Sequence, residues 1–303
     1  MGISKPTAIL LIEEGLLRPF SGAVLQLGRQ DIDMTRDELG HILARHGQSR
    51  FANVGAGQTP ASDQDLFRAL GFSSVESLDA SDFEGARIVF DLNQATPPDT
   101  LRERFDVVIN GGTLEHVFHL PNALANLHAM LRPGGRAIHL APASNYLDHG
   151  LYAFSPAFFV DYYQANGYES ACLKLIRLRV GSHNDRVDVL DLDPRSTARR
   201  PLSFVGSLDG AAYMIFYVVI KRPGSSATHI PIQTLYADRW HAENRLANIA
   251  HDHMDHGGNS SRAARALARL AALPLAGPWF ADRAFRIGAA LRRARAGWRR
   301  IRL

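Results

Sequence analysis

Two histidines and a glutamate follow one apolar run of this sequence and could carry acid–base chemistry. The run covers residues 105–110, and Glu115, His116 and His119 come shortly after it. Histidine gains and loses a proton near neutral pH, so His116 or His119 is a candidate general base. The structural alternative is that Glu115 caps the following helix while His116 packs beneath it.

Polar residues and glycines also follow the other apolar runs of this half of the chain. They are Gly28 and Gln30 after 23–27, Asp79 at the end of 74–79 with Ala80 next to it, Asp91 near the end of 86–92 with Asn93 just beyond it, and Gly111, Gly112 and Thr113 after 105–110. An acid at a strand end can accept both hydrogen bonds of a ribose diol, and a carboxylate or amide can meet an adenine amine. Glycine lets the backbone approach a ligand closely. Because open α/β sheets bind ligands at the carboxyl ends of their strands, we expect one nucleoside-shaped cleft here.

The segment 141–156 is a candidate for acceptor recognition. It carries Asn145, Tyr146, His149 and Tyr152. Aromatic faces can pack on a sugar or another ring while polar groups orient it. The alternative is a solvated crossover loop.

The elements that would position these residues alternate between strand and helix. Strands are predicted at 23–27, 74–79, 86–92, 105–110, 135–142, 172–180 and 211–221, and helices at 35–47, 62–71, 120–132 and 155–167. This alternation is typical of a mostly parallel sheet covered on both faces. The interval 31–62 is long enough for an inserted loop or helix, and 181–209 predicts a long hairpin excursion.

The run "FDVVINGGTLEHVFHLPNALANLHAMLRPGGRAIHL" at 105–140 resembles the class I S-adenosylmethionine-dependent methyltransferases. The resemblance covers roughly residues 22–221. It implies an α/β fold: a Rossmann-like, seven-stranded, mostly parallel sheet with helices on both faces. It also implies S-adenosylmethionine as cofactor, with Asp79 as the ribose acid, Asp91 or Asn93 as the adenine contact, and Gly111 to Thr113 as the wall beside the methionine part.

The first turn departs from that family. Gln26 stands where the family has an acid, and Arg29 and Gln30 stand where a small residue and a glycine are usual. Side chains with a Cβ atom would push this turn outward unless the backbone path differs. The stretch "NVGAGQTP" at 53–60 is an alternative source of glycines.

Two functions are therefore predicted. The first is methyl transfer to an oxygen or nitrogen of an acceptor such as a saccharide or glycan intermediate. The second is a catalytically inactive protein of the same fold that acts as a binding or assembly partner. A nicotinamide-dependent oxidoreductase is disfavoured because no G-x-G-x-x-G follows the first strand.

Composition limits the setting of this chemistry. The chain has 303 residues, with 46% hydrophobic and 21% charged, which is ordinary for a soluble globular protein. The single Cys172 excludes an internal disulfide framework and a multi-cysteine zinc site. With no targeting or membrane-spanning pattern, a cytoplasmic location is expected.

The C-terminal part differs from the rest. Residues 1–222 are predicted to form the α/β domain and 223–303 a basic helical extension. From Arg262 onward there are eleven arginines and one acid, Asp282, a formal charge of +10 that leaves −6 for the rest. An apolar stripe at helical spacing accompanies them: Phe280, Ala284, Ile287, Leu291, Ala294, Trp298 and Ile301.

Such a helix suits an anionic membrane surface at the inner face of a membrane, or packs on the domain or on a protein partner. Nucleic acid is the least favoured partner, because no aromatic residues are interleaved with the arginines. The run His251, Asp252, His253, Asp255 and His256 could in principle hold a metal ion. Exposed runs of this kind are usually solvated, so no metal site is assigned.

Overall fold

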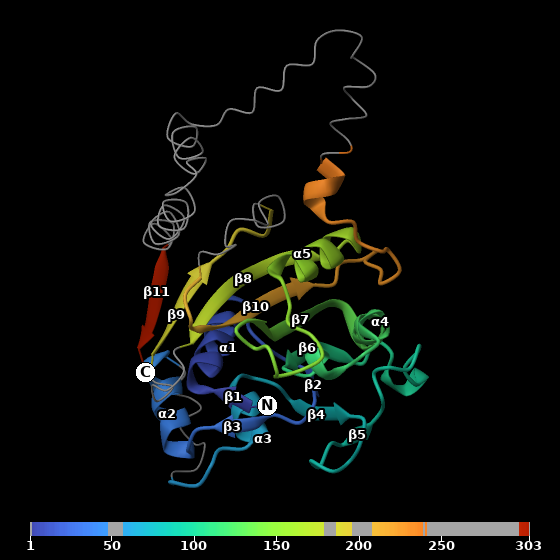
Figure 1. Cartoon of the computed structure of the whole chain (residues 1–303). Coiled ribbons are helices and arrows are strands. Elements are labelled where there is room, and N and C mark those ends of the chain that lie inside the picture. Colours follow the sequence, from blue (N-terminus) through green and yellow to red (C-terminus); the bar gives the residue numbers. More distant parts are fainter. Residues whose placement is uncertain are drawn as a thin grey trace, which may run out of the picture.

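A mixed sheet of nine strands forms the centre of the computed structural model (Figure 1). The structure describes residues 2–47, 57–178, 186–195, 208–238, 240 and 297–302. From one edge to the other, the strands are β11 (Trp298–Arg302), β9 (Arg186–Asp191), β8 (Glu169–Leu178), β10 (Ala212–Ile220), β7 (Leu131–Ser144), β6 (Phe105–Gly111), β2 (Ala23–Leu27), β4 (Ser74–Asp79) and β5 (Ile88–Val89).

The sheet is parallel in one half and antiparallel in the other. Strands β7, β6, β2, β4 and β5 pair in parallel, whereas β10, β8, β9 and β11 join by antiparallel pairings. The expectation of seven mostly parallel strands is therefore corrected for the described residues. The two extra strands arise because β9 folds back on β8 and the chain end returns as β11.

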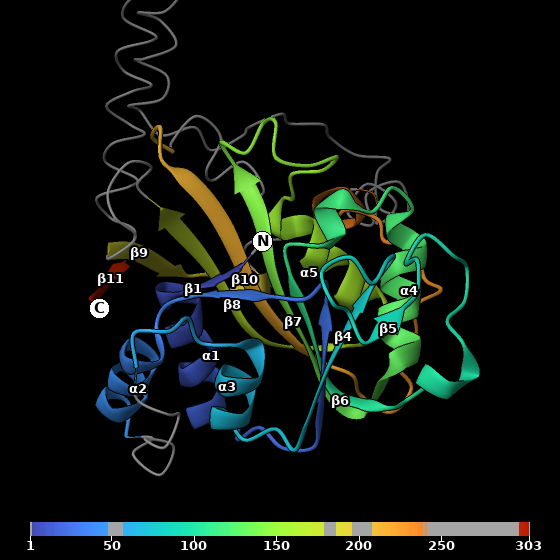
Figure 2. The same ribbon diagram turned by 90° about the horizontal axis from the view of Figure 1, so that it is seen from below.

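Helices cover both faces of the sheet (Figure 2). The helices α1 (Lys5–Leu17), α2 (Arg36–Arg45) and α3 (Asp63–Ala69) share one core cluster, and α4 (Leu120–Met130) and α5 (Pro156–Ala165) share the other. Along β6, Val107 and Ile109 enter the first cluster and Val108 enters the second. Successive side chains of a strand point to opposite faces, which is why the middle of β6 is apolar at consecutive positions.

The inserted helix expected within 31–62 is confirmed as α2. It begins at a capping box in which Thr35 and Glu38 each satisfy a backbone N–H of the other. The helix predicted at 62–71 is α3, which begins in the same way with a capping box of Ser62 and Asp65. Two short helical turns, η2 (Asp99–Leu101) and η3 (Leu114–His116), lie between β5 and α4.

Helix α1 was not predicted from the sequence. Residues from Pro6 to Ile12 are buried on every side, so the helix has no polar face to produce the usual periodicity. A small second sheet pairs β1 (Gly2–Ser4) with β3 (Asp31–Asp33) in parallel. Among the described residues, no helix is both long and apolar enough to cross a membrane.

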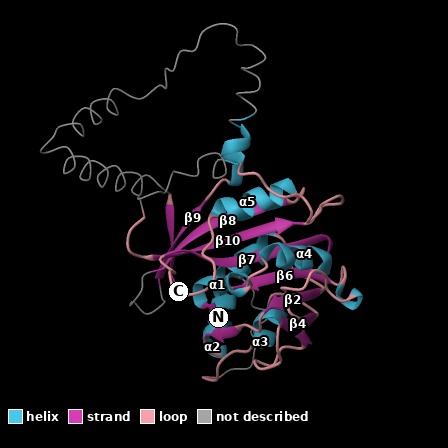
Figure 3. Cartoon of the chain, turned by 45° about the vertical axis from the view of Figure 1, so that its right-hand side comes forward, coloured by secondary structure: helices cyan, strands magenta, loops and turns pink. Residues whose placement is uncertain are grey.

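The chain end contradicts the predicted basic helix in part (Figure 3). Trp298 and Ile301 belong to β11, which pairs with β9, and not to a helical stripe. Ile301 is buried, and the Trp298 ring lies 6.2 Å from the Tyr213 ring. The three-residue spacing of Trp298 and Ile301 fits one face of a helix. The segment forms a strand instead, because pairing with β9 lets it cover the apolar side of the sheet. The rest of the stripe and the run 251–256 lie outside the described residues.

The described residues just after 222 pack on the α/β domain. Ser226 and the His229 backbone N–H both donate to the side-chain oxygen of Asn166, and the Thr234 hydroxyl donates to Asp161. The stretch 53–60 is described from Gly57 onward. Gly57 donates to Asp37 of α2, so this residue lies against α2 and supplies no glycine to the first turn.

Candidate active site

The turn after β2 brings three of the predicted cofactor residues together. Gly28 is buried with φ of +69°, and its N–H donates to the Leu78 carbonyl at 2.7 Å. A Cβ at this position would lie 2.8 Å from Thr113 Oγ1 and 3.8 Å from Asp79 Oδ2. Thr113 in turn donates to the Leu27 carbonyl at 2.5 Å. The turn thus requires glycine and lies between the ends of β4 and β6.

The Gln30 side chain packs against Gly28 and Gly111, which have no side chains of their own. Its side-chain amide donates to the carbonyls of Leu27 and Gly28, both at 3.2 Å, and its Oε1 is buried with no hydrogen-bond partner. A Cβ on Gly111 would lie 2.3 Å from that oxygen. Gly111 therefore serves the close approach of Gln30, so the unusual residue is accommodated inside the turn and does not push it outward.

Gln26 and Asp63 explain how the turn holds without the acid usual in the family. Gln26 accepts from the backbone N–H of Gln30 at 3.2 Å and donates to Asp63 at 2.8 Å. Asp63, the buried first residue of α3, thereby supplies a carboxylate beside β2. Sequence reasoning missed Asp63, because nothing in the local pattern connects it with a residue 37 positions earlier.

Arg29 points toward the loop between β4 and β5. Its guanidinium donates to the Glu84 carbonyl at 3.3 Å and lies 4.0 Å from Asp63. A Cβ on Gly85 would be 2.8 Å from the same guanidinium. The side chain is 46% exposed, so it lies across the outer surface of this loop.

The ends of β4 and β5 provide the remaining predicted contacts. Asp79 is half-buried and accepts from the Ala80 N–H at 2.6 Å. Asp91 accepts from both the backbone and the side-chain amide of Asn93. Asn93 accepts from the His119 N–H at 2.9 Å, so both ends of its amide already hold the loop together.

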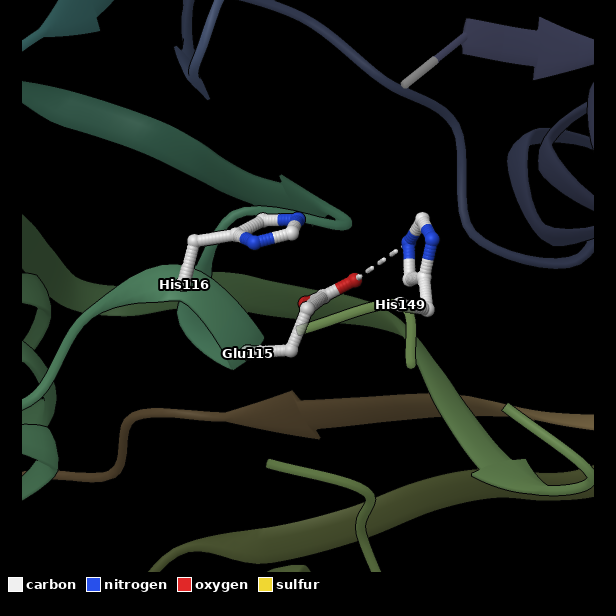
Figure 4. Close-up of side chains that lie close together, drawn as sticks. All are labelled: Glu115, His116 and His149. Atoms are coloured by element: carbon white, nitrogen blue, oxygen red, sulfur yellow. Dashed lines mark ion pairs between the residues drawn. The ribbon is translucent and has the colours of Figure 1, made fainter. Parts of the chain in front are cut away.

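Glu115, His116 and His149 lie close together at the same edge of the sheet (Figure 4). Their candidate ligand atoms are all within 4.8 Å of one another. Glu115 Oε1 lies 3.8 Å from His149 Nε2, and the two imidazole rings are 5.4 Å apart at 66°. His149 comes from the loop after β7, so the segment expected to recognise the acceptor does reach Glu115.

Burial controls the protonation of this cluster. Glu115 is fully buried, neither of its side-chain oxygens has a hydrogen-bond partner, and burial raises its pKa to about 7. Burial and the neighbouring His149 lower the pKa of His116. Burial and Glu115 together raise the pKa of Tyr146, whose ring lies 5.5 Å from that of His149.

The loop 145–152 is pinned to η3. The N–H groups of Leu151 and Tyr152 both donate to the Glu115 carbonyl, and the Tyr152 hydroxyl donates to the Phe118 carbonyl at 2.9 Å. Asn145 has φ of +60° and donates to the Ala211 carbonyl at 2.6 Å. Of the predicted acceptor residues, Tyr146 and His149 therefore reach the cluster, whereas Asn145 and Tyr152 use their polar groups to hold the loop.

The structural alternative for Glu115 and His116 is wrong. Helix α4 has no side-chain cap, Glu115 makes no hydrogen bond through its carboxylate, and His116 is exposed rather than packed beneath the helix. His119 is also exposed, at the start of α4 and outside the cluster, with its ring 5.3 Å from Phe118. The two candidate bases thus differ in their surroundings.

Comparison with known proteins identifies the domain. Residues 53–178 match a family model described as a methyltransferase domain. No curated protein matches the chain significantly.

Solved structures give distant likenesses only. One is from a study of the conversion of a disulfide bond into a thioacetal group during echinomycin biosynthesis (17% identity, 82% of this chain, 88% of that chain, TM-score 0.38). Another is the 1,6-didemethyltoxoflavin-N1-methyltransferase of Burkholderia thailandensis with bound 1,6-didemethyltoxoflavin and S-adenosylhomocysteine (16% identity, 72% of this chain, 78% of that chain, TM-score 0.35). A third, from Thermotoga maritima, is described as a possible histamine N-methyltransferase (14% identity, 73% of this chain, 90% of that chain, TM-score 0.35). No substrate is inferred from these likenesses. The family model confirms the family expected from the sequence: this chain contains a methyltransferase domain.

Proposed function

We propose that this chain transfers a methyl group from S-adenosylmethionine to an oxygen or nitrogen atom of a small-molecule acceptor. One observation carries the proposal: the glycine turn after β2 and the Glu115, His116 and His149 cluster lie at the same edge of the sheet, joined by the short segment 111–116. A donor and an acceptor bound at these neighbouring places would meet.

The residues of the turn fit the cofactor by their chemistry. Gly28 lets the backbone turn tightly against Thr113, the buried Gln30 Oε1 has no partner, and Asp79 Oδ2 lies beside the turn. In this proposal Asp79 and Ala80 bind the ribose, and Gly28, Gln30 and the segment 111–113 line the methionine part. Asp91 takes the adenine amine, because the Asn93 amide is already paired at both ends.

The chain's own residues would then orient the acceptor and accept its proton. S-adenosylmethionine supplies an electrophilic methyl group on a sulfonium, and an in-line displacement of this kind depends largely on positioning. His116, exposed at the edge of the cluster, is the first candidate for the proton of the acceptor, and His119 is the second. Tyr146 and His149 would contact the acceptor itself.

Ligand binding and single turnover test the proposal in two stages. Titration with S-adenosylmethionine and with S-adenosylhomocysteine should raise the melting temperature progressively with concentration. Asp79→Ala should weaken this response, whereas Asp99→Ala on η2, an exposed acid outside the turn, should leave it unchanged. No shift at millimolar ligand would instead support the catalytically inactive binding protein. With an acceptor in hand, a His116→Ala variant that retains the single-turnover rate would transfer the base role to His119.

We further propose that the acceptor is a saccharide or glycan intermediate and that the basic segment 262–296 meets an anionic membrane surface or a protein partner. The support is the aromatic and polar loop 145–152 together with the charge of the segment. This arrangement would place a cytoplasmic protein at the inner face of a membrane.

Because β11 is part of the sheet, truncation would confound the test of this segment. Replacing Arg283, Arg286, Arg292 and Arg293 by glutamine leaves β11 intact. Loss of co-sedimentation with anionic vesicles is the expected result, and equal pelleting of both proteins would refute the membrane role.

A further inference from the structure

Glu115 is a buried carboxylate with no hydrogen bond to satisfy it. Its side chain is 0% exposed, and both oxygens lack a hydrogen-bond partner. A buried ionised group without a partner is strongly destabilising, so such a group either binds a proton or meets a cation. Among the described residues, no lysine or arginine forms a salt bridge with Glu115, and the basic side chain recorded beside it is the His149 imidazole, with Nε2 3.8 Å from Oε1.

Two imidazoles stand beside this carboxylate in an arrangement that suits a shared ion. Glu115, His116 and His149 each offer one donor atom, and these three atoms lie within 4.8 Å of one another. Imidazole nitrogen and carboxylate oxygen bind zinc at about 2.0–2.2 Å in a tetrahedral arrangement, so two donors on one ion lie about 3.3–3.6 Å apart. Glu115 Oε1 and His149 Nε2, at 3.8 Å, are already near this spacing. Rotations of the exposed His116 and the partly exposed His149 side chains can close the remaining difference, which is at most about 1.5 Å.

The backbone holds these three residues in place without a ligand. Glu115 and His116 are neighbours on η3, directly after β6. The two N–H groups donated to the Glu115 carbonyl fix the loop that carries His149, and a Cβ on Gly150 would lie 3.0 Å from the same carbonyl oxygen. The Tyr146 ring packs edge-on against His149. Donor atoms that are held in place before binding lose less conformational entropy when the ion binds, which favours binding.

We propose that Glu115, His116 and His149 form a binding site for one divalent transition-metal ion of the zinc type. Two imidazoles and one carboxylate favour zinc, cobalt, nickel or iron(II), whereas magnesium and calcium prefer sites made of oxygen alone. Three protein ligands leave at least one coordination position for a water or another molecule. The presence of the ion does not depend on methyl transfer.

The consequence for catalysis does rest on the proposed function. A metal ion on His116 occupies the lone pair that would otherwise take a proton, so the ion and the base role of His116 exclude each other. An acceptor hydroxyl bound at the open position would lose its proton more readily, because a bound divalent cation stabilises the oxyanion. His119, outside the cluster, would remain available to receive that proton.

Cobalt(II) absorption is the direct test, because it reports coordination and not activity. The full chain is purified with a chelator, and His251, His253 and His256 are replaced by glutamine in every sample so that this histidine run does not bind the probe. Titration with cobalt chloride should produce visible d–d bands that saturate at one ion per chain, and zinc chloride should abolish them.

The variants decide between this site and adventitious binding. Glu115→Gln keeps the shape of the side chain but removes the charge, and it should weaken zinc binding at least tenfold in calorimetry while raising the melting temperature of the metal-free protein. His149→Ala should weaken zinc binding similarly, and His119→Ala should not. No d–d bands, or equal losses in His119→Ala and His149→Ala, would overturn the proposal.

Titration of the metal-loaded protein with S-adenosylmethionine is a separate measurement. Its failure would remove the proposed function and leave the metal site standing.

Discussion

Replacing Ile301 by alanine tests whether the chain end is a strand of the sheet. Ile301 is 4% exposed, pairs with Val187 across β11 and β9, and belongs to the core cluster that contains Val189 and Ile176. Truncating a buried isoleucine to alanine costs about 2–5 kcal/mol, and an edge strand that can partly collapse belongs near the lower end. We therefore expect a loss of about 2–3 kcal/mol in the free energy of unfolding. At about 2–4 °C per kcal/mol for a domain of this size, the melting temperature should fall by roughly 5–10 °C.

Arg299→Ala is the matched control on the same strand. Arg299 pairs with Glu13 of α1 through two hydrogen bonds, but its side chain is 44% exposed, and surface pairs of this kind contribute about 0–1 kcal/mol. Both variants are compared with the unmodified chain by thermal melting and by urea unfolding at neutral pH. If the end of the chain were a helix detached from the domain, Ile301→Ala would change stability by less than about 0.5 kcal/mol. A melting temperature within a degree of the parent, or equal to that of Arg299→Ala, would refute the strand.

Three further predictions concern the turn and the core. Gly28→Ala places a Cβ 2.8 Å from Thr113 Oγ1 and forces alanine into a left-handed conformation, which costs about 1–2 kcal/mol. Calorimetry should show at least a tenfold loss of S-adenosylmethionine affinity. Unchanged affinity would show that this turn does not bind the cofactor. Thr113→Val removes the hydrogen bond to the Leu27 carbonyl, so unfolding by urea should become easier by about 1 kcal/mol, and an unchanged midpoint would contradict the role given to that bond. Burial lowers the pKa of His139 to about 3 from its ordinary value of 6.5, so the unfolded chain binds the proton first and stability is lost as pH falls from about 6.5 towards 3. At pH 4 this loss is on the order of 3 kcal/mol, and His139→Gln should lose less stability between pH 7 and pH 4 than the parent; equal losses would show that His139 is not responsible.

Local pattern was enough to predict the strands at the centre of the sheet. The bounds of β2 and β4 agree with the predicted ranges because each is a short segment with buried apolar residues that a turn follows. At the edge, β5 covers only Ile88–Val89 of the predicted 86–92. An edge strand has one partner, so pairing with β4 decides its length, and the sequence does not show where that pairing ends.

The local pattern also predicted the positions of the polar residues of the site at the ends of the strands. It did not predict which of these residues contact one another. Sequence order places Glu115 and His116 after β6, and the parallel sheet dictates that they lie at the ligand-binding edge. It does not show that Asp63 supports Gln26 from another helix, since these residues meet only through packing of α3 on the sheet.

The sequence by itself determined the family, the alternation of strands and helices, and the edge at which the chemistry lies, because each depends on residues close together in the chain. Tertiary structure decided the number of strands, the strand at the chain end and the meeting of His149 with Glu115. Each of these joins segments that are distant in sequence. Such contacts depend on which surfaces are left uncovered after the sheet has formed, and no local pattern contains that information.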